Sequence, residues 1–176
     1  RNRFHTIRSR ERFAFVCPVS SNRMAKRRVS RCARDRVCAL VGLGYYSRDI
    51  LAPALQLTTQ CELRGIVTGS PEKIPVWQKR YDIPDKNVYN YENMHTISNN
   101  PDIDIVYIVL PNALHKEYTI VGANAGKHVW CEKPMAMTVQ ECRQMIDACQ
   151  KNKVQLTVGY RMQHEPVTQT IIGWRK

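Results

Sequence analysis

The sequence lacks any apolar run close to the ~20 residues that a helix needs to cross a bilayer, so it predicts no membrane span. Its seven cysteines include no Cys-x-x-Cys pair, and no histidine stands near a cysteine at metal-ligand spacing. A structural zinc site is therefore not expected, and no metal site is predicted. The cysteines are interpreted as free thiols of a protein in a reducing compartment.

Acidic residues are scarce at the start of the 176-residue chain. Residues 1–36 carry twelve lysines and arginines but only Glu11 and Asp35 as acids, which accounts for most of the formal net charge of +12. These residues are interpreted as a basic, disordered arm, similar in composition to an organellar transit peptide. The arm lacks a recognisable nucleic-acid-binding module, so nucleic acid is not expected as a partner. We expect a cytoplasmic protein, and the arm leaves an organellar or exported form open.

Apolar runs alternate with helical patterns in the rest of the chain. Strands are predicted at residues 37–41, 61–68, 88–89, 103–110, 128–131 and 154–159. Helices are predicted at 47–57, 71–81 with a distorted first turn, 91–97, 115–125 and 139–149, the last after a capping box of Thr138 and Glu141. Strand and helix in alternation predict an α/β fold, a doubly wound parallel sheet of the Rossmann type. Residues 37–163 are thus predicted to form one dinucleotide-binding domain.

The turn after the first predicted strand carries Gly42 and Gly44, followed by helix-forming sequence. Such a turn lets the backbone approach a pyrophosphate, and the start of the helix offers unpaired N–H groups to its negative charge. Ser47 stands where the dinucleotide-binding pattern usually has its third glycine or an alanine. Since two glycines alone also fit a plain turn, the nucleotide hypothesis depends on the other strand ends.

The second predicted strand ends in the segment Thr68-Gly69-Ser70-Pro71-Glu72-Lys73. It has no acidic residue at its tip, where an NAD-specific site binds the ribose hydroxyls. Hydroxyl groups and a lysine suit the additional phosphate of NADP, so the segment favours NADP over NAD. A simpler interpretation, compatible with the first, is that Ser70 caps the next helix, with Pro71 in its first position, while Lys73 is solvated.

Glu132-Lys133-Pro134 follows the fifth predicted strand, where a nicotinamide would lie in a dinucleotide-binding sheet. A lysine there can donate a hydrogen bond to a substrate hydroxyl and, when removed from water, exchange a proton with it. Pro134 fixes the local backbone and can be cis. An isolated Glu-Lys-Pro is commonly a loop without catalytic meaning, and only its position after the strand favours the catalytic interpretation.

Four segments at the predicted strand ends carry a stronger signal together than separately. They are Val-Gly-Leu-Gly-Tyr-Tyr (41–46), Ile-Val-Leu-Pro-Asn-Ala-Leu-His (108–115), Ala-Gly-Lys-His-Val-Trp-Cys-Glu-Lys-Pro (125–134) and Val-Gly-Tyr-Arg (158–161). In order and spacing they resemble the glucose-fructose oxidoreductase (Gfo/Idh/MocA) family of sugar and polyol dehydrogenases, and most closely its glucose-fructose oxidoreductase branch. The resemblance covers about residues 36–172.

The resemblance implies which residues bind the cofactor. The residues at the pyrophosphate would be Gly42, Gly44, Tyr45 and Tyr46. The adenosine ribose and its phosphate would be bound by Thr68, Gly69, Ser70 and Lys73. The nicotinamide side would be lined by Leu110, Pro111, Asn112 and His115, with Glu132 near the nicotinamide ribose. Lys133 matches the active-site lysine, which polarises the substrate hydroxyl during hydride transfer. Arg161 matches a position near cofactor and substrate, and Ser47, in place of glycine, is expected to loosen the helix packing slightly.

The resemblance also implies a function, that of the NADP(H)-binding domain of an oxidoreductase acting on a CH–OH group of a sugar or polyol. Family members continue into a second domain, which supplies most substrate contacts and the oligomer interface. That domain is absent from this sequence, and residues 164–176 are expected to begin the helix leading to it. Turnover and homo-oligomers are therefore expected only with the second domain. The alternative is a non-catalytic, nucleotide-sensing regulator of the same fold.

Overall fold

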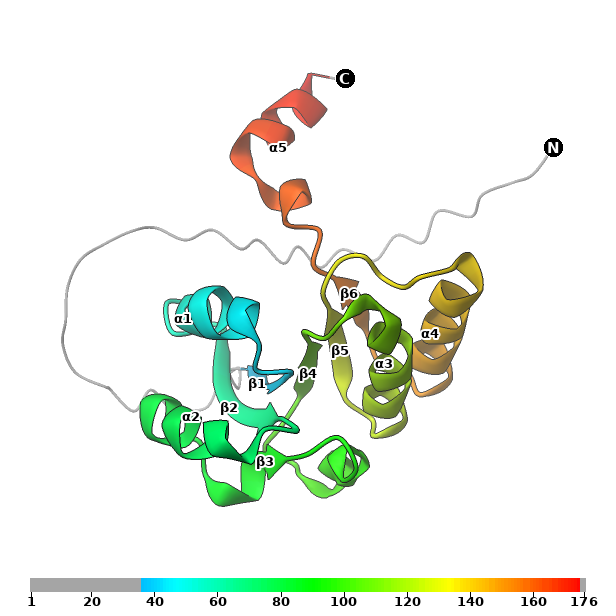
Figure 1. Cartoon of the computed structure of the whole chain (residues 1–176). Coiled ribbons are helices and arrows are strands. Elements are labelled where there is room, and N and C mark those ends of the chain that lie inside the picture. Colours follow the sequence, from blue (N-terminus) through cyan, green and yellow to red (C-terminus); the bar gives the residue numbers. More distant parts are fainter. Residues whose placement is uncertain (1–35, 175–176) are drawn as a thin grey trace. The chain divides into compact units, whose positions relative to one another are not determined.

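The computed structural model describes residues 36–174, and residues 36–161 of these form one compact unit built on a six-stranded sheet (Figure 1). The strands are β1 (Arg36–Val41), β2 (Cys61–Val67), β3 (Val88–Tyr89), β4 (Ile105–Ile108), β5 (His128–Cys131) and β6 (Leu156–Val158). Their spatial order is β3-β2-β1-β4-β5-β6, and all neighbours are parallel. This is the predicted doubly wound order, in which the winding reverses between β1 and β4. The basic arm lies outside the described residues, apart from Arg36.

Helical segments connect consecutive strands. They are the π-helix η1 (Ser47–Leu51) with α1 (Ala52–Leu55), the 3₁₀ helix η2 (Pro71–Lys73) with α2 (Ile74–Tyr81), the 3₁₀ helices η3 (Asp85–Asn87), η4 (Met94–Asn99) and η5 (Asn112–Leu114), and then α3 (His115–Asn124) and α4 (Val139–Lys151). The distorted first turn predicted for residues 71–81 is confirmed as η2. The π turn at residues 47–51 was not predicted. Pro53, which has no N–H to donate, is the second residue after it.

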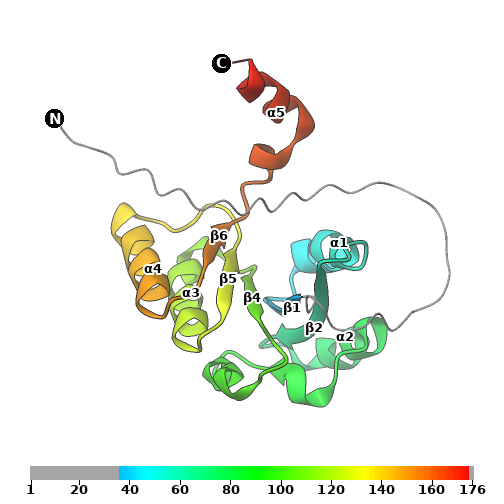
Figure 2. The ribbon, with the colours of Figure 1, turned by 180° about the vertical axis from the view of Figure 1, so that it is seen from behind.

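Alternate residues of the strands enter two different hydrophobic cores, since successive strand side chains point to opposite faces of a sheet. Cys38 and Leu40 of β1 pack with Trp77 of α2 and with α1, whereas Ala39 and Val41 pack in the core that includes Met145 of α4. Figures 1 and 2 accordingly show α1 and α2 on one side of the molecule and α3 and α4 on the other. Loops and helical segments follow the carboxyl ends of the strands.

The capping box before α4 is present with one difference from the expected pattern. Thr138 Oγ1 accepts the Glu141 N–H at 3.2 Å, as predicted. The Glu141 carboxylate returns to the N–H of Met137, at 3.1 Å, and not to that of Thr138. The side chain thus caps one residue further from the helix.

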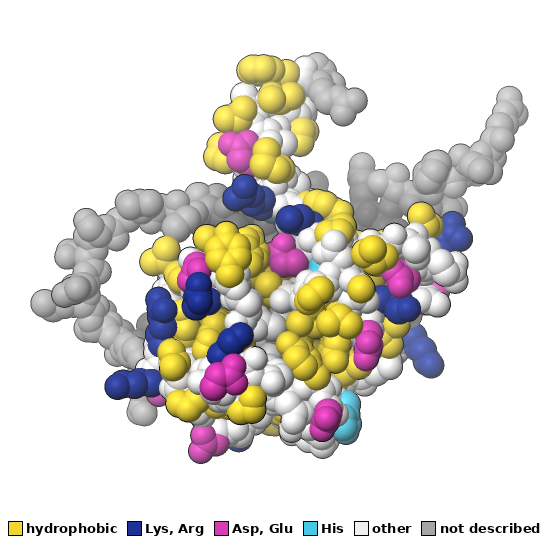
Figure 3. Space-filling model, in the orientation of Figure 1, with side chains coloured by type: hydrophobic (Ala, Val, Ile, Leu, Met, Phe, Trp, Pro, Cys, Tyr) yellow, Lys and Arg dark blue, Asp and Glu magenta, His cyan; other side chains and the backbone are white. Residues whose placement is uncertain are grey.

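The surface and the thiols of the described residues fit the sequence analysis. Basic and acidic side chains are interspersed on the face drawn in Figure 3. Cys38, Cys61, Cys131, Cys142 and Cys149 are free thiols, and Cys17 and Cys32 lie outside the described residues. Between residues 36 and 174 no helix is long and apolar enough for a membrane span, and no cluster of three or more His, Cys, Asp or Glu could hold a metal ion.

Residues 162–174 do not belong to the compact unit. They hold most of the 3₁₀ helix η6 (Arg161–His164) and then α5 (Pro166–Gly173). The Glu165 carboxylate caps α5 by accepting the Thr168 N–H at 2.8 Å. The helix expected from residue 164 therefore begins at Pro166.

Candidate functional site

The turn from β1 into the first helix is shaped by Gly42. Its φ of +94° is a conformation that other residues rarely adopt, and a side chain here would collide with the carbonyl oxygen of Val109. The Gly42 N–H continues the sheet by donating to Val67 O at 3.0 Å, and a first helical bond runs from Arg48 N to Gly44 O at 3.0 Å. Because the N–H groups of a first helical turn have no partners within the helix, this turn can bind an anion. The predicted strand, turn and helix are confirmed.

Ser47 contributes to this turn directly. Its side chain is completely buried, and its hydroxyl donates to the carbonyl oxygen of Gly42 at 2.5 Å. The hydroxyl therefore ties the helix to the turn, and the slight loosening of the helix packing expected from serine stays a prediction. Gly44 and Tyr45 are exposed beside it, and Tyr46 is half-buried.

The tip of β2 is held by Thr68 rather than by Ser70. The buried Thr68 hydroxyl accepts the Ser70 N–H at 3.1 Å. Ser70 occupies the N-cap position and Pro71 the first position of η2, as predicted, but the Ser70 side chain makes no capping bond. The reason lies in the main chain: Pro71 has no N–H, and the Lys73 N–H already donates to the Ser70 carbonyl at 3.1 Å. The Ser70 hydroxyl is left for another partner.

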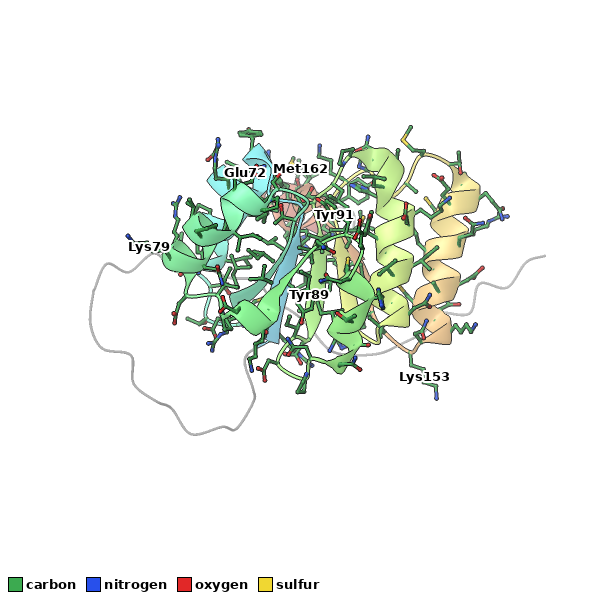
Figure 4. All side chains as sticks on the ribbon, turned by 60° about the horizontal axis from the view of Figure 1, so that its bottom comes forward. Glu72, Lys79, Tyr89, Tyr91, Lys153 and Met162 are labelled. Carbon is green, nitrogen blue, oxygen red and sulfur yellow. The ribbon has the colours of Figure 1, made fainter. Side chains whose placement is uncertain are left out.

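Lys73 joins the β2 tip to the glycine turn. Its ammonium donates to the carbonyl oxygen of Leu43 at 3.3 Å, so the interpretation of Lys73 as merely solvated is wrong. Gly69, on the same tip, lies against Tyr91, whose ring a Cβ at position 69 would approach to 3.0 Å. Tyr91 in turn packs on Tyr118 of α3 with 5.3 Å between the ring centroids; it is labelled in Figure 4. The tip therefore packs against an aromatic pair through Gly69.

His115 connects the loops that follow β4 and β5. The ring is completely buried, with Nδ1 2.7 Å from Pro134 O and Nε2 2.9 Å from Leu110 O. Both ring nitrogens thus face backbone carbonyls, and neither is left for a ligand. The residues of the predicted nicotinamide side that face solvent are Pro111 and Asn112, and Leu110 is half-buried.

Glu132 is buried at the end of β5, with 7 % of its surface exposed. One carboxylate oxygen accepts the Tyr107 hydroxyl at 2.6 Å, and the other accepts the Lys133 N–H at 3.2 Å. Removal from water, which is the larger cause, and this hydrogen bond together raise the pKa of Tyr107 well above its ordinary value. Sequence reasoning missed Tyr107, and the available signal was a hydroxyl inside the most apolar predicted strand.

Lys133 extends from an anchored loop into solvent. The Lys133–Pro134 peptide bond is cis, as the sequence allowed. The Cys131 thiol donates to Met135 O at 3.8 Å, and burial raises the pKa of this thiol to about 12. The Lys133 side chain is exposed, and its ammonium makes no hydrogen bond or ion pair within residues 36–161.

Tyr46, Glu132 and Arg161 are close enough to affect one another electrically. Burial and then the negative charge of Glu132 raise the pKa of Tyr46, while the Arg161 guanidinium opposes this shift. Residues from the ends of β1, β5 and β6 thus converge, as predicted from the parallel sheet. The β2 tip reaches the same edge through Lys73 and Leu43.

A family model described as "Oxidoreductase family, NAD-binding Rossmann fold" matches residues 36–160. Among curated proteins, the chain is similar to D-xylose 1-dehydrogenase [NADP(+)] of Haloarcula marismortui, with 31% identity over 73% of this chain and 35% of the relative. It is likewise similar to 1,5-anhydro-D-fructose reductase of Ensifer adhaerens, with 31% identity over 71% of this chain and 36% of the relative. The chain thus spans about a third of the length of these relatives.

A solved structure shows the same architecture with higher identity. Aldose-aldose oxidoreductase from Caulobacter crescentus, complexed with glycerol, superposes with a TM-score of 0.73 at 44% identity, over 75% of this chain and 39% of that one. NADP complexes of KijD10, a 3-ketoreductase from Actinomadura kijaniata, share the fold at 20% identity with a TM-score of 0.71.

Proposed function

Because this chain belongs to the oxidoreductase family with an NAD-binding Rossmann fold, we propose that residues 36–161 bind NADP(H) at the carboxyl ends of the strands. They would serve as the cofactor domain of an enzyme that acts on a hydroxyl or carbonyl group of a sugar or polyol. Relatives named as xylose dehydrogenase, anhydrofructose reductase and aldose-aldose oxidoreductase support this substrate class.

The observation that carries the choice of NADP is the position of Lys73. Its ammonium lies against Leu43 O, between the β2 tip and the glycine turn. Residues 68–70, which follow β2 directly, carry no carboxylate. A dinucleotide bound by this fold places its adenosine ribose at the same tip. The additional phosphate would take Lys73 and the uncommitted Ser70 hydroxyl as donors, since cations and hydroxyls stabilise phosphate oxygens.

The glycine turn fits the pyrophosphate of such a cofactor. No atom lies within 4 Å of the place where a Cβ of Gly44 would stand, so the backbone is open to a ligand. The first helical N–H groups, near Tyr45 and Tyr46, supply donors for its oxygens.

The loops after β4 and β5 would form the nicotinamide end, with Leu110, Pro111, Asn112 and Glu132 around it. The nicotinamide, when bound, supplies the hydride acceptor or donor. Lys133 would donate a hydrogen bond to the reacting substrate oxygen, and Arg161 would stand beside cofactor and substrate. The exposed position of Lys133 leaves its ammonium available for that contact.

Titration of the 176-residue chain with NADPH and NADH, followed by fluorescence or calorimetry, tests the proposal. We expect saturable binding with a preference for NADPH. Lys73→Ala should weaken NADPH binding roughly tenfold and leave NADH nearly unchanged, because only NADPH presents the additional phosphate. Lys79→Ala, which removes an exposed lysine of α2 labelled in Figure 4, is the matched control and should change neither. Absence of saturable binding would contradict the proposed function.

The alternative of a nucleotide-sensing regulator shares the cofactor-binding half of this proposal. Lys133 separates the two, since a regulator has no need for an unpaired ammonium at the nicotinamide end. A protein partner whose binding requires NADP(H) would favour the regulator.

A further inference from the structure

Tyr107 and Glu132 are brought together by the register of two neighbouring strands. In the pairing of β4 with β5, Tyr107 lies opposite Trp130, two residues before Glu132. The side chains of Trp130 and Glu132 point to the same face of the sheet, so the Tyr107 side chain lies beside the end of β5. The Tyr107 hydroxyl donates to one Glu132 oxygen at 2.6 Å, and the other oxygen accepts the Lys133 N–H at 3.2 Å. The carboxylate therefore links a side chain of the central sheet to the main chain of the lysine that follows it.

The surrounding residues leave the carboxylate little freedom. A Cβ on Gly159, at the end of β6, would lie 3.0 Å from Glu132 Oε1 and 3.3 Å from its Cδ. The Trp130 ring meets the Tyr107 ring edge-on, with 5.5 Å between centroids, and so holds the phenol from the side. A buried carboxylate that loses one of its two donors is costly to keep in place, so Glu132 depends on Tyr107.

We propose that Tyr107 is a positioning residue of the cofactor site, holding the Glu132 carboxylate and through it the main chain of Lys133 at the nicotinamide end. This inference rests on the proposed function, because it needs a nicotinamide as the group that Lys133 is positioned for. Tyr107 does not itself contact the cofactor. Its hydroxyl is committed to Glu132, and its effect reaches only the loop after β5.

The test compares two ligands on the same 176-residue chain. NADPH occupies both ends of the site, whereas adenosine 2′,5′-bisphosphate has the adenine half and no nicotinamide. Tyr107→Phe keeps the ring against Trp130 and removes only the hydroxyl. We expect roughly fivefold weaker binding of NADPH and a change of less than about twofold for the bisphosphate, since one hydrogen bond to a charged group is lost at one end only. A merely structural role would weaken both ligands equally and would overturn the proposal.

Tyr81→Phe is the matched control for removal of a tyrosine hydroxyl. Tyr81 is buried, whereas Tyr107 is half-buried, and the Tyr81 hydroxyl has no hydrogen-bond partner among the described residues. Binding of both ligands to this variant should equal that of the unaltered chain.

A double-mutant cycle shows whether Tyr107 acts through Glu132. In a Glu132→Ala background, Tyr107→Phe should change NADPH affinity by less than about twofold, because the acceptor of the Tyr107 hydroxyl is already gone. Additive effects of the two substitutions would overturn the proposal.

Gly159→Ala supplies a second variant if Tyr107→Phe does not fold. The added methyl displaces the carboxylate from the other side, so the same selective loss of NADPH affinity is expected. Equal loss for both ligands contradicts the inference. Failure of the unaltered chain to bind NADPH would overturn the proposed function and the inference with it, whereas normal binding to an unaffected Tyr107→Phe variant would overturn the inference alone.

Discussion

The loops after β2 and β5 lie at the same edge of the sheet, yet different kinds of contact hold them. The β2 tip is joined to the glycine turn by the long side chain of Lys73, which is half-exposed. The β5 loop is joined to its neighbours by the buried side chains of His115 and Cys131 and by the half-buried side chain of Tyr107. A flexible cation suits recognition of a phosphate charge, whereas hydrogen bonds in a dry interior suit the placement of a reacting group. The two ends of one proposed site thus differ in rigidity.

The largest expected effect comes from breaking the buried connection between the β4 and β5 loops. His115→Ala removes the imidazole that lies between two backbone carbonyls and opens a cavity, so we expect a loss of about 3 kcal/mol in the free energy of unfolding. Denaturant unfolding measures it. His95→Ala is the matched control, because His95 is exposed in η4, and should change the free energy by less than about 0.5 kcal/mol. Equal losses of free energy in the two variants would contradict this account, because His115 would then stabilise the β5 loop no more than an exposed histidine stabilises η4.

A smaller effect is expected from Tyr107→Phe, which removes the partly buried bond to Glu132. We expect a loss of about 1.5 kcal/mol in the free energy of unfolding at neutral pH, and no loss from Tyr81→Phe.

The pKa of Tyr107 is raised by burial and by Glu132, so the folded chain keeps a proton that the unfolded chain releases above about pH 10. The stabilisation from Tyr107 is therefore complete below about pH 10 and is lost as the pH rises further. The advantage of the unaltered chain over Tyr107→Phe should accordingly narrow in alkaline denaturation experiments, and a constant difference would contradict this account.

The smallest effect concerns the half-exposed contact at the other end. Raising the ionic strength from about 0.05 to 0.5 M should weaken NADPH binding several-fold in the unaltered chain, because salt screens exposed charges. Lys73→Ala should show about half that dependence on a logarithmic scale. Identical salt dependence in the two proteins would mean that Lys73 does not meet the phosphate.

The sequence sufficed for the sheet because each strand carries its own signal. Val88–Tyr89 and His128–Cys131 were predicted to the residue, and β4 was predicted too long because Ile103 and Leu110 are apolar but lie beyond the pairing. Placing the predicted site residues at strand ends followed from the parallel order alone.

The contacts within the site could not be predicted, because they join residues far apart along the chain. The Tyr107–Glu132 bond depends on the register of β4 against β5, and the Lys73–Leu43 bond spans thirty residues. The Ser70 side chain makes no capping bond for a local reason, the bond from the Lys73 N–H to the Ser70 carbonyl, which propensities do not capture. Such details require the backbone path and not only the residue pattern.

The serine at position 47 has a consequence for the way dinucleotide-binding sequences are found. Patterns that demand glycine or alanine at the third position assume that any larger residue would push the helix away from the strand. Here the Ser47 hydroxyl donates a hydrogen bond to the carbonyl oxygen of Gly42, and the side chain is completely buried. A search pattern that admits serine at this place would therefore retrieve chains in which a hydrogen bond replaces a close contact, and the stricter pattern would discard them.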